Sequence, residues 1–535
     1  MRAAIFLIAF TAAHAGVLSR DWENGKLGLQ LDNGVAEVEW ISSTAFRFSR
    51  GAASLPVLPK IKHEAVALEF EDTRGALKLR GRYMTVEVDK GTAKLRVSAN
   101  NETIATLSVE PASDGLALNV APLGKIFGLA GTGDSQRFFF TSGYGIFVSA
   151  PRACTFDLDH GAVRAPSSHS MDVIFYYGPT PKEIFEQHQS VTGRTEIPAQ
   201  SLLVPSSDRL PSAASPLPGT SLDSWDALSH LVRTLNEWSS SAVIYPALDL
   251  STLSSARGEI AKRASDLAAI SPLLYGDRRN VNLAARQKWE PYLVTYLREA
   301  YDRGYPLIRP LPVQFSRDKN LDPQPGVFML GDEVLLAPVV APGSHQHLQL
   351  PRGLWTDLRT DIEYKGNQAI DVEAPPGQVP TLARNGAILP LAAKNAMELH
   401  YFPSLGGEFF LWESDKRDNS EFHAAPAGDF IRVEIESKVT RTYEWVIHHT
   451  KRPLNVDDCK PVRQRSSLKP GTWWHDNARN DLHVMVHAEA GSDVIVNISF
   501  SVHAKALSSP RNFFVFFACS ASLRENDLRC STKSA

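Results

Sequence analysis

The sequence of 535 residues predicts a mainly β protein with an α/β middle. Three observations support this fold class. Residues 16–178 contain short stretches in which apolar and polar side chains alternate, residues 224–304 carry apolar side chains at helical spacing, and residues 306–500 return to strands and turns. These periods are typical of half-buried strands and amphipathic helices. A chain of this length is expected to form three or four domains.

Residues 1–15 have the pattern of a signal peptide. Arg2 supplies a positive start, residues 3–13 are almost purely apolar, and Ala13-His14-Ala15 fits the small-x-small cleavage pattern. We therefore expect a secreted or periplasmic protein; a buried first strand is the alternative. The apolar run is shorter than the ~20 residues that span a bilayer, and no other stretch approaches that length, so no membrane span is expected.

Residues 16–195 are expected to form an N-terminal β-sandwich. Residues 86–89 alternate with period two, turn at Lys90-Gly91 and resume at residues 94–97, which predicts a hairpin with one exposed face. Similar strands are expected at 36–40 and 77–80. A helix is predicted to begin after Thr180, where Thr-Pro-Lys-Glu has the form of a capping box with proline at the first helical position, and to end near Gly193.

The middle of the chain begins with a linker-like stretch. Five prolines lie between residues 198 and 219, so neither a strand nor a long helix is expected there. Two helices follow, marked by apolar residues at 225–235 and 289–300, and Pro291 is expected to kink or restart the second. Gly304 is placed as its C-terminal stop. Between the helices, residues 242–245 form an apolar run that predicts a buried strand.

Two smaller C-terminal β-sandwiches are expected, a proximal one at 312–395 and a distal one at 396–502. Their strands are predicted at residues 334–340, 386–389 and 409–412. Residues 503–535 are interpreted as an irregular, disordered or non-homologous tail. A peripheral strand or a partner-binding segment is the alternative.

Composition excludes several classes of function. The formal charge of −3 gives no electrostatic basis for binding nucleic acid or an anionic membrane. The four cysteines are too scattered for a disulfide framework and lack metal-ligand spacing. Free thiols are expected, and an incidental disulfide is the alternative. The sequence contains no Gly-rich phosphate loop, and no metal or organic cofactor is expected.

Several segments in order resemble glycoside hydrolase family 31, the α-glucosidase and α-xylosidase family. The longer segments are, in chain order, FFFTSGYGIFVSAP (138–151), DVIFYYGPTPKEIFEQHQSVTGR (172–194), YLREAYDRGYPLIRPLP (296–312), FMLGDEVLLAP (328–338) and PTLARNGAILPL (380–391). Trp355-Thr356-Asp357 lies between the last two and also fits the family's order. The alternative is an unrelated β-rich secreted protein. The resemblance implies a galactose-mutarotase-like N-terminal β-sandwich, then a (β/α)8 barrel, then two C-terminal β-sandwiches. It also implies retaining hydrolysis of α-O-glycosidic bonds.

The match breaks where the barrel should be. Arg194 and Pro310 are 116 residues apart, whereas a (β/α)8 barrel needs about 250 residues. Residues 196–311 are therefore predicted to be an incomplete, truncated barrel remnant that lacks the first half or more. The family's Trp-x-Asp-Met-Asn-Glu-like nucleophile stretch is not found. Trp355-Thr356-Asp357 shares part of its skeleton but belongs to the C-terminal pattern. No catalytic residue can be assigned.

The family's acid/base motif is also altered. Gly219 to Trp225 fits its frame with Thr220 at the acid/base position, and a threonine hydroxyl cannot donate a proton as a carboxylic acid does. Asp223 could take over the acid/base role. It lies just before a predicted helix, so its alternative role is that of an N-cap or first-turn carboxylate. Trp225 is a candidate aromatic contact for sugar; it also marks the apolar face of the helix.

Two further positions carry candidate sugar-binding residues by resemblance. Asp249 matches the aspartate of an Asp-Ile-Gly-Gly strand end whose glycines are here Ser251 and Thr252. Its alternative role is a strand-end or capping aspartate. Asp277 stands where the family has a histidine, and Tyr275 replaces an arginine. Because Asp277 precedes two arginines, a solvated charge cluster is its alternative.

Three hypotheses remain open at the level of sequence. The chain is a catalytically silent relative that still contacts carbohydrate of the α-glucoside or α-xyloside class. Alternatively, it is a working glycosidase with a rebuilt carboxylate pair such as Asp249 and Asp277. The third hypothesis is a non-functional product of a truncated gene. The sequence does not predict the oligomeric state.

Overall fold

The computed structural model describes residues 16–51, 61, 63–131, 133–193, 214–219, 221–276, 283–318, 321–324 and 326–501. The expected signal peptide (1–15) and tail (503–535) lie outside the described residues. The chain forms two units, of which the first comprises the residues up to 194 with 240–242 and 303–305, and the second comprises the rest. Among the described helices, none combines the length and apolarity needed to cross a membrane.

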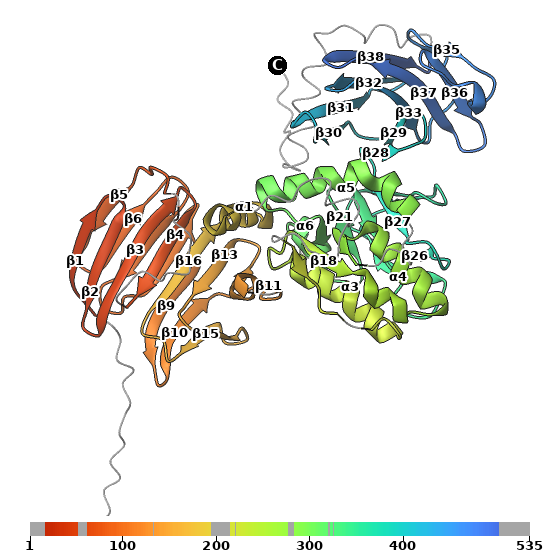
Figure 1. The fold of residues 1–535 in the computed structure, drawn as a ribbon. Coiled ribbons are helices and arrows are strands. Elements are labelled where there is room, and N and C mark those ends of the chain that lie inside the picture. Colours follow the sequence, from red (N-terminus) through yellow and green to blue (C-terminus); the bar gives the residue numbers. More distant parts are fainter. Residues whose placement is uncertain are drawn as a thin grey trace, which may run out of the picture. The chain divides into compact units, whose positions relative to one another are not determined.

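The N-terminal unit is built from two antiparallel eight-stranded sheets (Figure 1). The first has the order β1-β2-β3-β4-β16-β13-β12-β11, with β1 (Val17–Glu23), β2 (Lys26–Leu31), β3 (Gly34–Ser42), β4 (Ala45–Arg50), β11 (Phe127–Gly128), β12 (Phe138–Phe140), β13 (Tyr144–Ser149) and β16 (Met171–Tyr177). The second has the order β14-β15-β10-β9-β8-β7-β6-β5, with β5 (Glu69–Asp72), β6 (Ala76–Arg80), β7 (Thr85–Asp89), β8 (Leu95–Ala99), β9 (Glu102–Ala112), β10 (Gly115–Ala121), β14 (Thr155–Asp157) and β15 (Ala162–Pro166). Apolar side chains of both sheets share one core.

The hairpin of β7 and β8 shows why these residues form strands. Val86 pairs with Val97 across the two strands, and both side chains are fully buried while the intervening positions face outward. The Asp89 carboxylate accepts hydrogen bonds from the backbone N–H of Gly91 and Thr92, which closes the turn. The predicted hairpin is confirmed.

Helix α1 (Pro181–Thr192) follows β16 and has the predicted bounds. The predicted capping box is wrong in detail, because the Thr180 hydroxyl donates to the Glu183 carboxylate instead of bonding the backbone. On its buried face, His188 stacks on Phe138 with ring centroids 4.0 Å apart and lies 3.2 Å from the Tyr176 hydroxyl. Complete burial lowers the pKa of His188 to about 3, so the ring is neutral.

The α/β segment of the second unit contains a three-stranded parallel sheet, β17-β18-β19. Its elements are β17 (Ser215–Pro216), α3 (Trp225–Ser239), β18 (Pro246–Asp249), the 3₁₀ helix η2 (Leu250–Ser255), α4 (Gly258–Ile270), β19 (Leu273–Tyr275), α5 (Leu283–Arg303), β20 (Ile308–Pro310) and α6 (Leu311–Gln314). Strand β20 does not join this sheet; it pairs antiparallel with β21 (Phe328–Leu330).

Two strand predictions in this segment are wrong. The run 242–245 is not a strand, because Ala242 adopts a left-handed φ of 61° and Val243 N–H still bonds Trp238 C=O behind it. The observed strand begins at Pro246, directly after the predicted run. The stretch 198–219, expected to hold no strand, ends in β17, where Ser215 N–H bonds Tyr245 C=O. Its residues 198–213 lie outside the described part.

Helix α5 passes through Pro291 as one helix. The helix does not restart at Pro291, and the other expectation, a kink there, stays a prediction. Proline removes the hydrogen bond to the carbonyl four residues earlier, and here that residue, Gln287, is exposed, so water can satisfy the carbonyl. The helix ends where predicted, before Gly304, whose φ is +74°.

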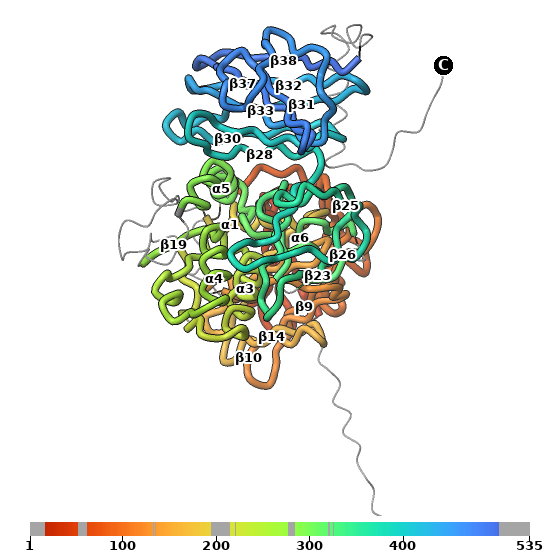
Figure 2. Tube along the Cα trace, turned by 90° about the vertical axis from the view of Figure 1, so that its right-hand side faces the viewer, coloured from red at the N-terminus to blue at the C-terminus, as the bar shows by residue number. Residues whose placement is uncertain are grey.

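The rest of the second unit is β structure in four sheets. One has the order β20-β21-β22-β27-β24-β25 and another is β23-β26, with β21 (Phe328–Leu330), β22 (Val334–Leu336), β23 (His345–Gln349), β24 (Leu354–Asp357), β25 (Glu363–Lys365), β26 (Ala369–Glu373) and β27 (Thr381–Arg384). The third has the order β28-β29-β33-β37-β36-β35 and the fourth β30-β31-β32-β38-β34, with β28 (Ile388–Ala392), β29 (Met397–Tyr401), β30 (Gly407–Glu413), β31 (Asp418–Pro426), β32 (Phe430–Ser437), β33 (Arg441–Ile447), β34 (Asn455–Val456), β35 (Lys460–Pro461), β36 (Thr472–Asp476), β37 (Asp481–Ala488) and β38 (Ser492–Ser499). Figures 1 and 2 show α5 beside β28 and β30.

The predicted C-terminal strands differ from the observed ones in length. The expected strand at 334–340 is only β22, and the one at 386–389 begins at Ile388, since Gly386 has a left-handed φ of 87°. The strand at 409–412 lies inside β30 as predicted. The two cysteines in the described residues, Cys154 and Cys459, are free thiols.

Candidate functional site

The candidate site lies at the carboxyl edge of the three-stranded parallel sheet. Asp249, the last residue of β18, pairs with Tyr275, the last residue of β19. In α/β folds the carboxyl ends of parallel strands open onto the loops that bind ligands, because all of these loops leave the sheet on the same side. The candidate Asp249 and Tyr275, the residue that replaces the family arginine, are therefore neighbours.

The Asp249 carboxylate has two partners. Its Oδ1 accepts a hydrogen bond from the Ser251 backbone N–H at 2.8 Å, which caps η2. It also hydrogen-bonds the Tyr275 hydroxyl, whose pKa is raised by burial and then by the Asp249 charge. The capping role expected as the alternative is thus observed. The carboxylate is half-buried, and its sugar-binding role stays a prediction.

The residues that replace the two family glycines build the turn after Asp249. Ser251 provides the capping N–H, and the Thr252 hydroxyl donates to the Asp249 carbonyl at 2.6 Å. The Ser255 hydroxyl donates to the Thr252 carbonyl and accepts from the Leu222 N–H at 2.8 Å. The segment before α3 is thereby attached to η2.

The altered acid/base motif lies in that segment. Thr220 lies outside the described residues. Asp223 is exposed and accepts a hydrogen bond from the Ser221 hydroxyl at 3.1 Å. Asp223 is not the N-cap: the Ser224 hydroxyl accepts from the Ala227 N–H, so Asp223 precedes the cap by one residue. Trp225 is the first residue of α3 and is half-buried.

Asp277 also lies outside the described residues, so the Asp249–Asp277 pair is not placed. The structure brings together Asp249 and Tyr275 and ties the Leu222 segment to the same turn. The remaining candidates, Trp225 and Asp277, stay predictions.

Sequence analysis missed a further carboxyl group of the α/β segment. Asp266 on α4 lines a cavity of about 470 Å3, and its buried Oδ2 has no hydrogen-bond partner. Burial raises the pKa of Asp266 to about 6, against the opposing charge of Arg263. The cavity is lined by Leu253, Ser254, Ala256, Arg257, Ala261, Lys262, Ser265, Asp266 and Gly377.

The sequence carries little signal for Asp266. Helical periodicity marks the apolar face of α4 and assigns its charged residues to the solvent. Instead, Arg263 is buried and donates to the carbonyls of Gly343, Ala374, Pro375 and Gln378. Arg263 is thus bound to loops far along the chain, which no local pattern predicts.

A second hollow, of about 490 Å3, lies on the N-terminal unit and is lined by residues of β1 to β4. Its lining is charged and includes Arg20, Asp21, Lys26, Glu37 and Arg47. Lys26 and Glu37 pair at 2.8 Å. Ion pairs of this exposed kind are typical of a solvated sheet face.

The site can accept hydrogen bonds from hydroxyl groups through Asp249, and Tyr275 provides an aromatic face beside it. Retaining hydrolysis needs more, namely two carboxyl groups about 5–5.5 Å apart with one as nucleophile and one as acid/base. Asp249 is the carboxylate that the structure places at the strand ends.

Comparison with known proteins adds to this geometry. Residues 304–389 match the glycosyl hydrolase family 31 C-terminal domain. The alpha-xylosidase of Saccharolobus solfataricus is 30% identical over 141 residues, which cover 24% of this chain and 19% of the relative. Alpha-glucosidase 2 of Bacillus thermoamyloliquefaciens is 27% identical over 162 residues, which cover 28% and 20%. The matches thus span about a fifth of the length of these curated relatives.

Solved structures show a similar fold over most of the chain. A GH31 dextranase of Flavobacterium johnsoniae, complexed with glucose, superposes with a TM-score of 0.78 at 14% sequence identity, covering 91% of this chain and 100% of that one. A point mutant of this dextranase, complexed with isomaltotriose, superposes with a TM-score of 0.77. The mainly β architecture with a small parallel α/β segment therefore follows the plan of this family.

Proposed function

Because this chain belongs to glycoside hydrolase family 31, we propose that it binds carbohydrate of the α-glucoside or α-xyloside class while its hydrolytic step is impaired. Carbohydrate would be held at the carboxyl edge of the parallel sheet. Asp249 would accept hydrogen bonds from sugar hydroxyls, and Trp225 and Tyr275 would offer aromatic faces. The substrate class rests on the relatives, which are named as α-xylosidase and α-glucosidase.

The three-stranded parallel sheet is the observation that carries this proposal. We interpret residues 196–311 as a truncated remnant of a (β/α)8 barrel, between a galactose-mutarotase-like sandwich at 16–195 and two β-sandwiches at 312–395 and 396–502. A complete barrel offers eight strand ends for catalytic groups, and catalytic residues come from several of them. Arg194 and Pro310 are only 116 positions apart, so the chain between them is too short to form most of the eight strands.

The chemistry of the remaining positions supports the same conclusion. The sequence lacks the family's nucleophile stretch and carries Thr220 at the acid/base position. Without a nucleophile no glycosyl-enzyme intermediate forms, and without an acid of suitable pKa the leaving group is not protonated. Loss of both groups removes both steps of the retaining mechanism.

A working glycosidase with a rebuilt carboxyl pair is a second candidate. The raised pKa of Asp266, about 6, favours it, since a general acid must be protonated near the working pH. The sequence offers Asp249 and Asp277 as carboxylates for such a pair. The remaining alternative, a non-functional product of a truncated gene, predicts a protein that does not unfold cooperatively.

The proposal is tested by measuring binding and turnover in the same preparation. Titration with isomaltose and with a xylosyl disaccharide should show binding to the wild type, and Asp249→Asn should weaken it at least tenfold, or about 1.4 kcal/mol. Asp371→Asn is the matched control, since Asp371 is an exposed aspartate on β26 paired with His347. Aryl α-glucosides and α-xylosides should not be hydrolysed.

Each other result selects an alternative. Wild-type turnover that Asp266→Asn or Asp249→Asn abolishes would establish the rebuilt pair. A folded protein that binds no sugar would refute both carbohydrate functions. Export is proposed from the signal-peptide pattern, and N-terminal sequencing of the secreted protein should begin at Gly16.

A further inference from the structure

We propose that Asp361, His448 and Asp481 form a binding site for one divalent transition-metal ion of the zinc class. The three side chains come from three segments of the second unit. Asp361 lies in the turn between β24 and β25, whereas His448 and His449 follow β33 and Asp481 begins β37. The site would join the proximal and distal C-terminal β regions, and it does not depend on the sugar-binding proposal.

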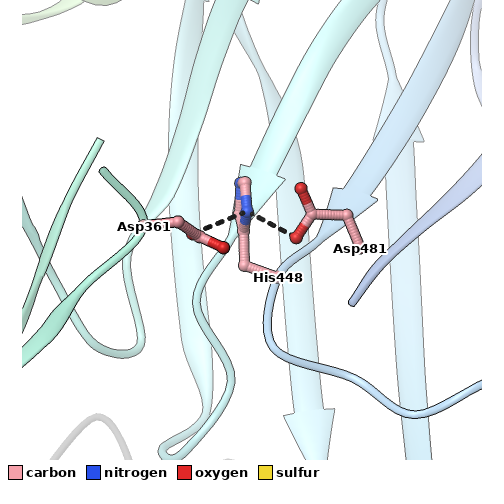
Figure 3. Close-up of side chains that lie close together, drawn as sticks. All are labelled: Asp361, His448 and Asp481. Atoms are coloured by element: carbon pink, nitrogen blue, oxygen red, sulfur yellow. Dashed lines mark hydrogen bonds and ion pairs between the residues drawn. The ribbon is translucent and has the colours of Figure 1, made fainter. Parts of the chain in front are cut away.

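The distances suit tetrahedral coordination (Figure 3). His448 Nδ1 lies 3.0 Å from Asp481 Oδ1 and 3.8 Å from Asp361 Oδ1, and the ligand atoms of the three residues lie within 4.8 Å of one another. Zinc bonds to nitrogen and oxygen are about 2.0–2.1 Å, so tetrahedral ligand atoms are about 3.3 Å apart. His449 Nε2 lies 3.0 Å from the same Asp361 oxygen and 3.2 Å from the Asp361 carbonyl oxygen, so it donates to Asp361 and positions that carboxylate. Three protein ligands would leave a fourth position for water.

The second shell of His448 has the arrangement that a metal-bound histidine requires. His448 Nε2 lies 3.0 Å from His400 Nδ1, and His400 Nε2 lies 3.1 Å from Glu398 Oε2. The Glu398 carboxylate can only accept, so a neutral His400 donates to it from Nε2 and accepts at Nδ1. His448 therefore donates from Nε2, as ligating histidines do through the nitrogen that faces away from the metal.

His448 Nδ1 faces two carboxylates, with Asp481 Oδ1 at 3.0 Å and Asp361 Oδ1 at 3.8 Å. Buried carboxylates this close together favour a positive centre between them. His449 donates to the Asp361 carboxylate at 3.0 Å and keeps it in this position. A divalent ion would be bonded by all three groups, because it carries the charge to balance two carboxylates. Arg479 reaches only the outer oxygen of Asp481, at 3.5 Å.

The protein holds these groups rigidly. Phe402 stacks on the His448 ring with centroids 4.4 Å apart and planes 5° from parallel. Asp361 and His449 both have left-handed backbones, with φ of 62° and 53°. Such conformations cost energy for residues other than glycine and are concentrated at functional sites. The His448 and Asp481 side chains are only 6% and 4% exposed, whereas His449 is 28% exposed and provides a route of entry.

The test uses the full chain after treatment with a chelator. Titration calorimetry with Zn²⁺ alone should show one ion per chain with a dissociation constant in the micromolar range or tighter, and zinc should raise the unfolding temperature. Asp361→Asn and Asp481→Asn should each weaken binding at least tenfold. His347→Ala is the control and should leave zinc binding unchanged. It also removes a histidine that pairs with an aspartate, Asp371 at 3.0 Å, but this pair is exposed and lies outside the proposed site.

X-ray absorption of the zinc-loaded protein should show one imidazole ligand and oxygen ligands within a four-coordinate shell. His448→Ala is a severe change at a buried position, so the partly exposed turn residue Asp361 provides the decisive variant. No stoichiometric binding at 100 µM Zn²⁺ would overturn the proposal, as would equal affinity in the wild type and Asp361→Asn.

Discussion

Arg309 shows how single residues position the α/β segment. Its buried guanidinium on β20 donates to Glu299 of α5 at 2.6 Å and to Asp332 in the turn between β21 and β22. Burial disfavours the charged guanidinium, but the two carboxylates outweigh it and raise the pKa of Arg309. A charge network of this kind is strongly destabilised when one member is removed, because the others stay buried without a partner.

We therefore expect Arg309→Ala to lower the free energy of unfolding by about 3–5 kcal/mol. The matched control is Arg359→Ala, because Arg359 pairs with Glu373 at 2.9 Å on the surface; it should cost less than about 1 kcal/mol. Denaturant unfolding followed by tryptophan fluorescence measures both. Equal losses in the two variants would contradict the network.

Thr295 links helix α5 to strand β30 through one hydroxyl. The hydroxyl donates to the Pro291 carbonyl at 2.9 Å and accepts from the Trp412 N–H at 3.1 Å. Thr295→Val should cost about 1–3 kcal/mol, because it leaves the Trp412 N–H without a partner. Thr234 also donates to a carbonyl four residues earlier, so Thr234→Val serves as the control and should cost less than about 1 kcal/mol in the same unfolding measurement. A larger loss from Thr234→Val would refute the link.

At the scale of elements, the turn between β21 and β22 depends on Gly331. It has a φ of +63°, and a Cβ there would lie 2.6 Å from Cδ2 and Cζ of Tyr296. Gly331→Ala should destabilise by about 2–4 kcal/mol, the sum of left-handed strain and steric overlap. Gly428 has a φ of +60° but open space around it, so Gly428→Ala should cost only about 1 kcal/mol. A calorimetric unfolding temperature that falls equally in both variants would exclude the steric term.

The elements also show what local sequence can predict. The β7–β8 hairpin and the bounds of α1 follow from alternation and from proline at the helix start, which are local signals. The strand at 246–249 was misplaced at 242–245, since the left-handed turn at Ala242 carries no sequence signature. Asp266 was missed for a different reason: its pKa and its cavity depend on burial by distant loops.

At the scale of the whole molecule, the architecture was predicted from resemblance more than from pattern. Alternation predicts strands but not their partners, and the sheets contain non-local pairs such as β4 with β16 and the parallel pair β29 with β33. The ordered family segments supplied the mainly β plan with a small parallel α/β part. In the described residues the parallel sheet has three strands, and the truncation of a larger barrel, inferred from chain length, stays a prediction.

Acid should destabilise the N-terminal unit through His188. Its folded pKa, about 3, lies below the ordinary value near 6.5, so the unfolded state binds the proton first. The free energy of unfolding is therefore highest above pH 6.5, where His188 is neutral in both states. It falls by about 1.4 kcal/mol per pH unit as the pH drops from 6.5 toward 3. His188→Gln should remove that slope, measured as hydrogen exchange of the α1 and β16 amides at pH 4–7. A wild-type slope equal to that of the variant would contradict the assignment.

The central claim is that this chain keeps carbohydrate contact but lacks the carboxyl pair of a retaining glycosidase. Single-turnover assay of the purified full chain with a fluorogenic α-glucoside and α-xyloside, beside isomaltose titration, tests it most directly. The account predicts saturable isomaltose binding that Asp249→Asn weakens, with no burst and no steady-state release of the fluorophore. A burst of one equivalent per chain, which marks a covalent glycosyl-enzyme intermediate, would contradict it.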